Sequence, residues 1–291
     1  MRLTMMTFVT SQYILTTFWR GFQVSVSSGF GSRLSNGEFM SDHNGNSINY
    51  VSYRVWDRTT RWFHWINVIC VLCLATLGIA ILNSKSFGVS GEGKILLKTL
   101  HVYVGYVFAT NLAWRLIWGF IGGQYSRWKN ILPGSGFIKE LRTCMSGFRK
   151  GDAPGYLGHH PMGRLMITLM MALMLTQAAT GLLLAGTDLY KPPFGNAIAE
   201  WVTAGDQAKL AQLAPGSKDF VDEAAYKEMR EFLKPFGRVQ IYVFYSLMVM
   251  IFLHILGVIV TEIRERNGLV SAMFSGRKVL AKPPVDRSCE P

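Results

Sequence analysis

The chain has 291 residues, of which 49% are hydrophobic and only 16% are charged. Its formal net charge is +12 at pH 7, a value that would suit a nucleic-acid-binding protein. The basic residues, however, gather beside long apolar runs. The charge therefore follows the pattern of membrane topology, and we expect no nucleic acid among the partners.

Residues 1–50 begin with a mildly apolar stretch that is interrupted by Thr, Ser and Gln, and they continue as a Ser-, Gly- and Asn-rich stretch. The apolar part is too short to span a membrane securely, and it lacks the small-residue cleavage site of a signal peptide. We expect residues 1–50 to be a disordered or artefactual extension. A membrane domain then covers residues 51–279, and a cytoplasmic tail covers residues 280–291.

Long apolar stretches are the main structural signal. A hydrocarbon core of about 30 Å takes roughly 20 residues at 1.5 Å each. Asp57, followed by Thr59 and Thr60, gives helix-start chemistry before the first stretch, and Pro161 suits the first turn of the third. We expect an all-α integral membrane fold with spans over Trp62–Ser84, Leu100–Gly122, Gly163–Gly186 and Val239–Ile263.

Charges are distributed unevenly over the connecting segments. Basic residues dominate before the first span, between the second and third, and after the fourth, whereas acids and bases nearly balance in segment 187–238. Cytoplasmic segments of membrane proteins are enriched in Lys and Arg. We therefore expect a multi-pass protein of the bacterial inner membrane with both termini in the cytoplasm. Segment 187–238 is then an extracytoplasmic helical insertion.

Three of the apolar runs contain a histidine, namely His64, His101 and His254. Ionisable side chains at membrane depth are costly and usually face a partner or a cofactor inside the bundle, and neutral imidazole is a good ligand of haem iron. With spans alternating in direction, His64 and His254 lie at similar depths, about 10 and 13 Å from the cytoplasmic ends of their helices. We expect them to ligate one haem. For either one alone, the alternative is a core imidazole bonded to a backbone carbonyl.

His101 lies at the opposite end of the second span. Position 240 on the fourth span has the matching depth, but Gln240 occupies it, and an amide is a poor haem ligand. Segment 187–253 contains no histidine. A second haem at this level therefore has one clear ligand only.

Other polar residues suit the edges of such a cofactor. Arg115 lies deep in the second span, where a haem propionate or a lipid phosphate is its natural partner. His159 and His160 precede the third span on the cytoplasmic side. They suit a haem propionate or a quinone carbonyl, with simple hydration at the interface as the alternative.

Several of these residues belong to longer motifs, and the motifs together resemble the bacterial cytochrome b family. That family includes the cytochrome b subunits of nickel–iron hydrogenases and the gamma subunit of formate dehydrogenase. The similar segments run from about Val51 to Val279, without the outer insertion, and in the fourth of them His160 replaces an asparagine. They are Arg61–Trp65 (R-x-x-H-W), Leu100–Tyr106 (H-x-x-x-G-Y), Arg115–Gly122 (R-L-x-W-G-F-x-G), Tyr156–Gly163 (Y-L-G-H-N-P-x-G), Leu253–His254 and Asn267–Lys278.

The resemblance implies a four-helix transmembrane bundle binding haem b, which carries electrons between the quinone pool and a redox partner. A hydrogenase, a dehydrogenase and a c-type cytochrome are all candidate partners, and membrane lipid surrounds the bundle. An alternative function is a non-redox or single-haem scaffold or assembly subunit of a respiratory complex.

The resemblance also carries over individual residues. It makes His64 and His254 the ligands of one haem and His101 a ligand of a second. The family's fourth ligand is a histidine fourteen residues before the last one, which is Gln240 here. The second haem is therefore lost, five-coordinate or ligated otherwise. The expected cofactor-binding residues are Arg61, Gly105, Arg115, His159 and His160.

Overall fold

The computed structural model describes residues 38–41, 47–150, 155–265, 268–280 and 284–286. The chain divides into two units, residues 1–49 and 50–291. The first unit holds strand β1 (Glu38–Ser41) and the start of β2 (Ser47–Arg54). Most of the expected extension over residues 1–50 lies outside the described residues.

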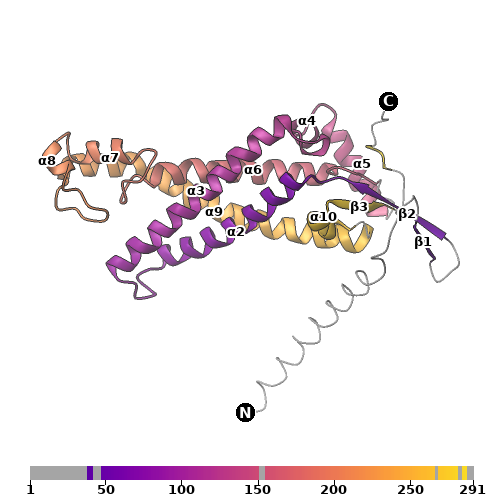
Figure 1. The fold of residues 1–291 in the computed structure, drawn as a ribbon, viewed down its shortest axis with the longest axis horizontal. Helices are drawn as coiled ribbons and strands as arrows, with labels where there is room; N and C mark the ends of the chain where they lie inside the picture. The colour runs from indigo at the N-terminus through magenta and orange to yellow at the C-terminus, as the bar shows by residue number, and fades with distance from the viewer. Residues whose placement is uncertain (1–37, 42–46, 151–154, 266–267, 281–283, 287–291) are drawn as a thin grey trace, which may run out of the picture. The chain divides into compact units, whose positions relative to one another are not determined.

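Four long helices make up most of the second unit (Figure 1). Each is long and apolar enough to cross a membrane. Helices satisfy their backbone hydrogen bonds internally, which is what a hydrocarbon environment requires. The second of them packs on both the first and the third, and the third packs on the fourth. They are α2 (Arg58–Leu82), α3 (Gly91–Ile121), α6 (Pro161–Leu184) and α9 (Glu223–Glu265).

Two of these helices begin earlier than the apolar runs suggest. Helix α3 starts at Gly91 because the Ser90 side chain caps it, accepting a hydrogen bond from the Gly93 amide at 3.1 Å. Helix α9 starts at Glu223 and continues through Pro235. A proline inside a helix removes one hydrogen bond and normally favours a break. Here α7 (Gly195–Val202) packs against α9, and buried Met229 and Leu233 hold the first turns in place.

A short two-stranded pairing lies between the segment before α2 and the segment after α10 (Leu269–Ser275). The expectation of an all-α fold did not include it. Strand β2 pairs antiparallel with β3 (Arg277–Leu280), from Val51 opposite Leu280 to Arg54 opposite Arg277. The turn into β3 uses Gly276, which has a positive φ of 78°. Its carbonyl accepts hydrogen bonds from the amides of Val55 and Trp56 at 2.9 and 3.1 Å. These bonds tie the entry of α2 to the exit of α10.

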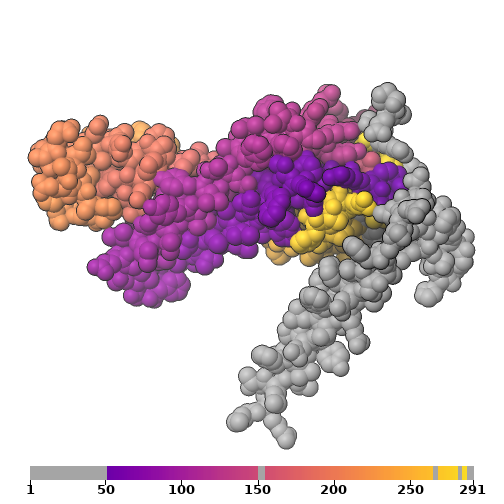
Figure 2. All heavy atoms as spheres, viewed as in Figure 1, coloured from indigo at the N-terminus to yellow at the C-terminus, as the bar shows by residue number. Residues whose placement is uncertain are grey.

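Shorter helices complete the two ends of the bundle. Helix α10 lies against the start of α2, as the yellow and indigo segments in Figure 2 show, and the Trp65 indole donates to the Met273 carbonyl at 3.2 Å. We call this the terminal end and the end with α7 the cap end. The remaining short elements are η1 (Gln124–Ser126), α4 (Trp128–Ile131), α5 (Phe137–Lys150) and α8 (Gln207–Leu210).

An apolar layer fills the middle of the bundle, with buried side chains from all four long helices. This layer separates the two ends, so the polar groups of each end form their own site. Its buried members are Cys70, Phe108, Leu112, Met171, Met174 and Leu247.

Asp57 links the first two long helices at the terminal end. Its carboxylate caps α2 by accepting from the Thr60 amide at 2.6 Å. It also accepts from the Ser126 hydroxyl at 2.7 Å and from the Trp118 indole at 3.2 Å. Its charge is close enough to act on Arg115, whose side chain is buried.

We expect Asp57→Ala to lower the free energy of unfolding by about 1–2 kcal/mol through the lost cap alone. The loss should be larger in total, because a buried cation that loses its counter-charge is strongly destabilising. Asp57→Asn is the matched control, since it keeps an acceptor oxygen without the charge, and should fall between Asp57→Ala and wild type. Thermal unfolding in detergent, followed by tryptophan fluorescence, measures both. Wild-type stability in Asp57→Ala would contradict this account.

Candidate functional site

His64 and His254 face the same region at the terminal end of the bundle. His64 lies in the second turn of α2, and His254 lies on α9 eleven residues before the helix ends at Glu265. Both rings are partly buried, and they are near enough to interact electrostatically. The structure therefore brings together the two histidines that matching depth predicts to meet.

Several buried nitrogen atoms at this end of the bundle have no partner. Among the described residues, Nδ1 of His64, Nε of Arg61, an Nη of Arg115 and Nδ1 of His159 have no hydrogen-bond partner. A buried polar group left unsatisfied costs about 1–3 kcal/mol. Four unpartnered nitrogen atoms at one end of the bundle indicate a site for a bound group. Such a group would accept hydrogen bonds and coordinate imidazole.

The arginines are held firmly by their other atoms. Arg61 donates through Nη1 to the Phe274 carbonyl on α10. Arg115 donates to the Ser126 carbonyl at 3.1 Å and lies 4.9 Å from the Trp128 ring centroid. Each arginine therefore has one part anchored on protein and a further buried N–H to offer. This arrangement fits the carboxylates of a haem, so the residues at the terminal end fit that cofactor.

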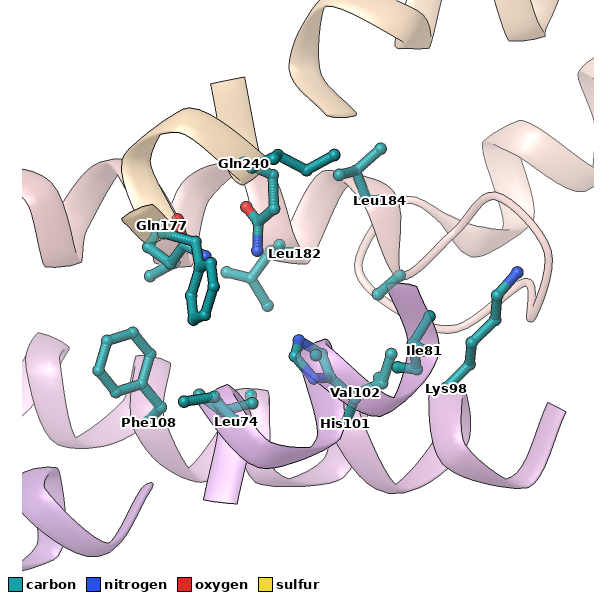
Figure 3. A pocket seen from close by; sticks show the side chains of 18 of the residues that line it. Leu74, Ile81, Lys98, His101, Val102, Phe108, Gln177, Leu182, Leu184 and Gln240 are labelled. Carbon is teal, nitrogen blue, oxygen red and sulfur yellow. The ribbon is translucent and has the colours of Figure 1, made fainter. Parts of the chain in front are cut away.

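His101 and Gln240 line a cavity of about 340 Å³ nearer the cap end, between all four long helices. Figure 3 shows the His101 ring and the Gln240 amide nitrogen directed into this cavity from opposite walls. Gly105 also lines it, and no described side chain or distant backbone atom lies within 4 Å of a Cβ placed there. The expected facing of His101 and Gln240 is therefore present, and the space between them is open.

Gln240 is fixed in this orientation by Thr180 on α6. The Thr180 hydroxyl hydrogen-bonds to Oε1 of Gln240, which leaves the amide nitrogen toward the cavity. An amide nitrogen donates hydrogen bonds but has no free lone pair for iron. The residues at this level therefore do not fit a second haem held by two protein ligands.

His159 and His160 point into different surroundings. The centre of the His159 ring lies 4.6 Å from that of the Trp56 ring. His159 is itself one of the described residues with an unpartnered buried nitrogen at the terminal end. Nδ1 of His160 lies 3.9 Å from the Cys144 sulfur, under α5. Burial and the positive charge of Lys278 lower the pKa of His159 to about 3 and that of His160 to about 4. Both imidazoles are thus neutral near pH 7.

Comparison with known proteins identifies the family of this chain. A family model described as prokaryotic cytochrome b561 matches residues 55–276. The chain belongs to the prokaryotic cytochrome b561 family. It is therefore a transmembrane b-type cytochrome, for which haem b is the implied cofactor.

Individual relatives of this cytochrome are all named as probable Ni/Fe-hydrogenase B-type cytochrome subunits. The Escherichia coli K12 subunit of hydrogenase 1 is 30% identical over 129 residues, which are 40% of this chain and 54% of that protein. The chain thus spans about half the length of that relative. The Rhizobium leguminosarum bv. viciae protein is 24% identical over 247 residues, 81% of this chain and 93% of its own. No solved structure matches.

Sequence reasoning missed the residues that shape the cap-end cavity of this b561-type cytochrome. Thr180 and Gln177 lie one turn apart on α6, and both approach α9 or the cavity. Lys98 forms an ion pair with Asp188 at the same cavity. The only signal was the presence of polar residues within or beside apolar runs, which does not tell which helix face they occupy.

His160 should make the stability of this cytochrome sensitive to acid. An unfolded histidine has a pKa of 6.5, against about 4 in the folded protein, so the unfolded state binds the proton first as the pH falls. The contribution of neutral His160 is complete above pH 6.5 and is lost as the pH falls toward 4. We expect the Tm of His160→Asn to fall less over this interval than that of wild type. Parallel Tm profiles, measured by circular dichroism in detergent, would contradict the assignment.

Proposed function

We propose that the chain binds one haem b between α2 and α9 and carries electrons between the quinone pool and a redox partner protein. One observation carries the proposal. His64 and His254 are near enough to interact electrostatically, at the end of the bundle where several buried donors have no hydrogen-bond partner in the described chain. When bound, the haem supplies one-electron redox chemistry. The protein supplies its ligands, its orientation and the surrounding polarity.

The chain's own residues have separate roles in this proposal. The imidazoles of His64 and His254 would hold the haem iron. Arg61 and Arg115 would donate their remaining N–H groups to the haem carboxylates, and their positive charges would favour the ionised form of these groups. Neutral His159 donates or accepts a hydrogen bond at the same edge, beside Trp56. His160 packs against Cys144 of α5. Its role is therefore to hold the segment before α6 in place and not to bind the cofactor.

The redox partner that fits the relatives' names is a Ni/Fe hydrogenase. A protein of this kind would deliver or accept electrons one at a time at the membrane surface. In the orientation that we propose, the termini and α5 face the cytoplasm of a bacterial cell, and the cap end lies outside the inner membrane. The excess of basic residues at the terminal end supports this orientation.

A scaffold or assembly role without redox chemistry is the second candidate, and Gln240 is the observation that favours it. A reduced-minus-oxidised visible spectrum of the purified protein separates the two functions. A b-type α-band supports the cytochrome, and a spectrum without haem bands supports the scaffold.

Removal of either axial ligand should change the haem spectrum. We expect His64→Ala and His254→Ala to abolish the low-spin b-type spectrum or convert it to a high-spin one, because each leaves at most one protein ligand. His101→Ala is the matched control at the other end of the bundle, and it should keep the low-spin signal. Low-spin spectra that persist in either of the first two variants would rule out this ligand pair.

The orientation can be tested by labelling in intact cells. In a chain freed of its own cysteines, Gln207→Cys and Arg142→Cys place single thiols at exposed positions of the cap end and of α5. We expect an impermeant maleimide to label Gln207→Cys in intact cells and Arg142→Cys only after lysis. The reverse pattern would invert the topology.

A further inference from the structure

The cap-end cavity has a chemistry of its own. It lies within the membrane-spanning part of the bundle, and its lining is almost wholly apolar apart from a few polar side chains. His101, Gln177 and Gln240 are the polar groups that lie between the helices (Figure 3). Within the described chain, Nδ1 of His101 and Oε1 of Gln177 are buried and have no partner. A cavity of this kind, apolar with a few oriented polar groups, is typical of a small-molecule site.

Glycines keep this space open. Gly78 on α2, Gly105 on α3 and Gly181 on α6 all line the cavity. A Cβ at Gly78 would lie 3.6 Å from the His101 ring, and one at Gly181 would lie 3.5 Å from the Gln240 amide nitrogen. A ligand can therefore approach the polar groups along the glycine surfaces of the helices, where no described side chain blocks it. This geometry suits a flat ring inserted between the helices.

The ligand should be neutral and should exchange hydrogen bonds. Gln240 offers amide hydrogens and cannot ligate iron. Lys98, the cation at the rim, is already paired with Asp188, so a bound acid would have to compete with that carboxylate. A haem, which needs a second axial ligand and carries two acidic groups, fits these residues poorly. An aromatic ring with two oxygen substituents fits them well.

A second cavity, of about 390 Å³ at the terminal end, does not suit such a molecule. It is lined by charged side chains, among them Lys129, Glu140, Arg164 and Asp286. Desolvating these groups against an apolar ring would cost free energy. The apolar cavity is therefore the better site for a membrane-soluble ring.

We propose that the cap-end cavity binds the ring of a quinone or quinol, with His101 and Gln240 hydrogen-bonding to its two oxygens from opposite walls. The proposal rests on the proposed electron-transfer function and adds the place where the quinone exchanges its electrons. Leu82 and Ile241 line the cavity and are also 49% and 37% exposed. The cavity thus reaches the lipid-facing surface, where an isoprenoid tail can leave it.

The position of the cavity suits electron transfer to the terminal end. Its lining includes Val71 on α2 and Met248 on α9. At 1.5 Å per residue, these lie about 10 Å from His64 and about 9 Å from His254 along their helices, whereas Gln240 lies about 21 Å from His254. Quinol oxidation breaks two O–H bonds and gives two electrons and two protons. A haem held by His64 and His254 would take up these electrons for the redox partner, and the protons would leave by the rim of the cavity, where Lys98 and Asp188 lie.

Filling the cavity tests the proposal on the purified, haem-loaded protein. We expect Gly105→Leu to weaken decylubiquinone binding, measured by isothermal titration calorimetry, by about tenfold or more. Reduction of the haem by decylubiquinol in stopped flow should slow similarly, while reduction by dithionite stays normal. Gly163→Leu is the matched control, because it also lies on a long helix with open space at its Cβ but outside the cavity. Unchanged binding in Gly105→Leu would overturn the proposal.

His101→Leu separates a quinone from a second haem. We expect weaker decylubiquinone binding with the haem content per chain unchanged. A fall of about half in haem content would show a haem at His101 and overturn the proposal. A wild-type protein that binds decylubiquinone in this cavity but no haem would contradict the electron-transfer function and leave the ring site standing.

Discussion

The structure of the terminal end depends on a guanidinium group that is buried between membrane-spanning helices. Burying this charge costs free energy, so neighbouring groups have to stabilise it. Arg115 is only 4% exposed, and a charge at that depth must be met by the protein itself. It is met by the Ser126 carbonyl and by the field of Asp57, whose carboxylate also caps α2 and binds Ser126. The segment after α3 and the start of α2 are therefore fixed together. One Nη of Arg115 has no partner among the described residues, and it lies at the end of the bundle that holds His64 and His254.

The four apolar helices could be predicted from the sequence, because apolar length is a one-dimensional quantity. Depth along a helix is one-dimensional too, and the pairing of His64 with His254 that it suggests stays a prediction. The short two-stranded pairing could not be predicted, because β2 and β3 are segments more than two hundred residues apart. The start of α9 at Glu223 could not be predicted either, because Pro235 lies inside the helix. That proline reads as a break, and only the packing of α7 on Met229 and Leu233 explains why the helix continues.

The cap-end cavity shows the same limit at the level of a site. The sequence predicts that Gln240 faces His101, but it leaves open whether other side chains fill the space between them. Rotation of α6 about its axis decides this, and periodicity does not fix that rotation. In the structure, α6 turns Gly181 and Thr180 toward α9, so the glycine leaves room and the hydroxyl orients the Gln240 amide. Gln240 thus presents an oriented hydrogen-bond donor to the cavity.

In the proposed arrangement, a single haem at the terminal end determines which surfaces can exchange electrons. Gln240 and His254 are fourteen residues apart, which is about 21 Å along α9. The apolar layer around Leu112 and Leu247 lies between the two ends. The first sixteen residues of α9 add about 24 Å toward the cap. A protein docked on the cap is therefore remote from His64 and His254. Direct exchange has to occur at the terminal end, and exchange from the cap end has to pass through a redox-active molecule in the cavity.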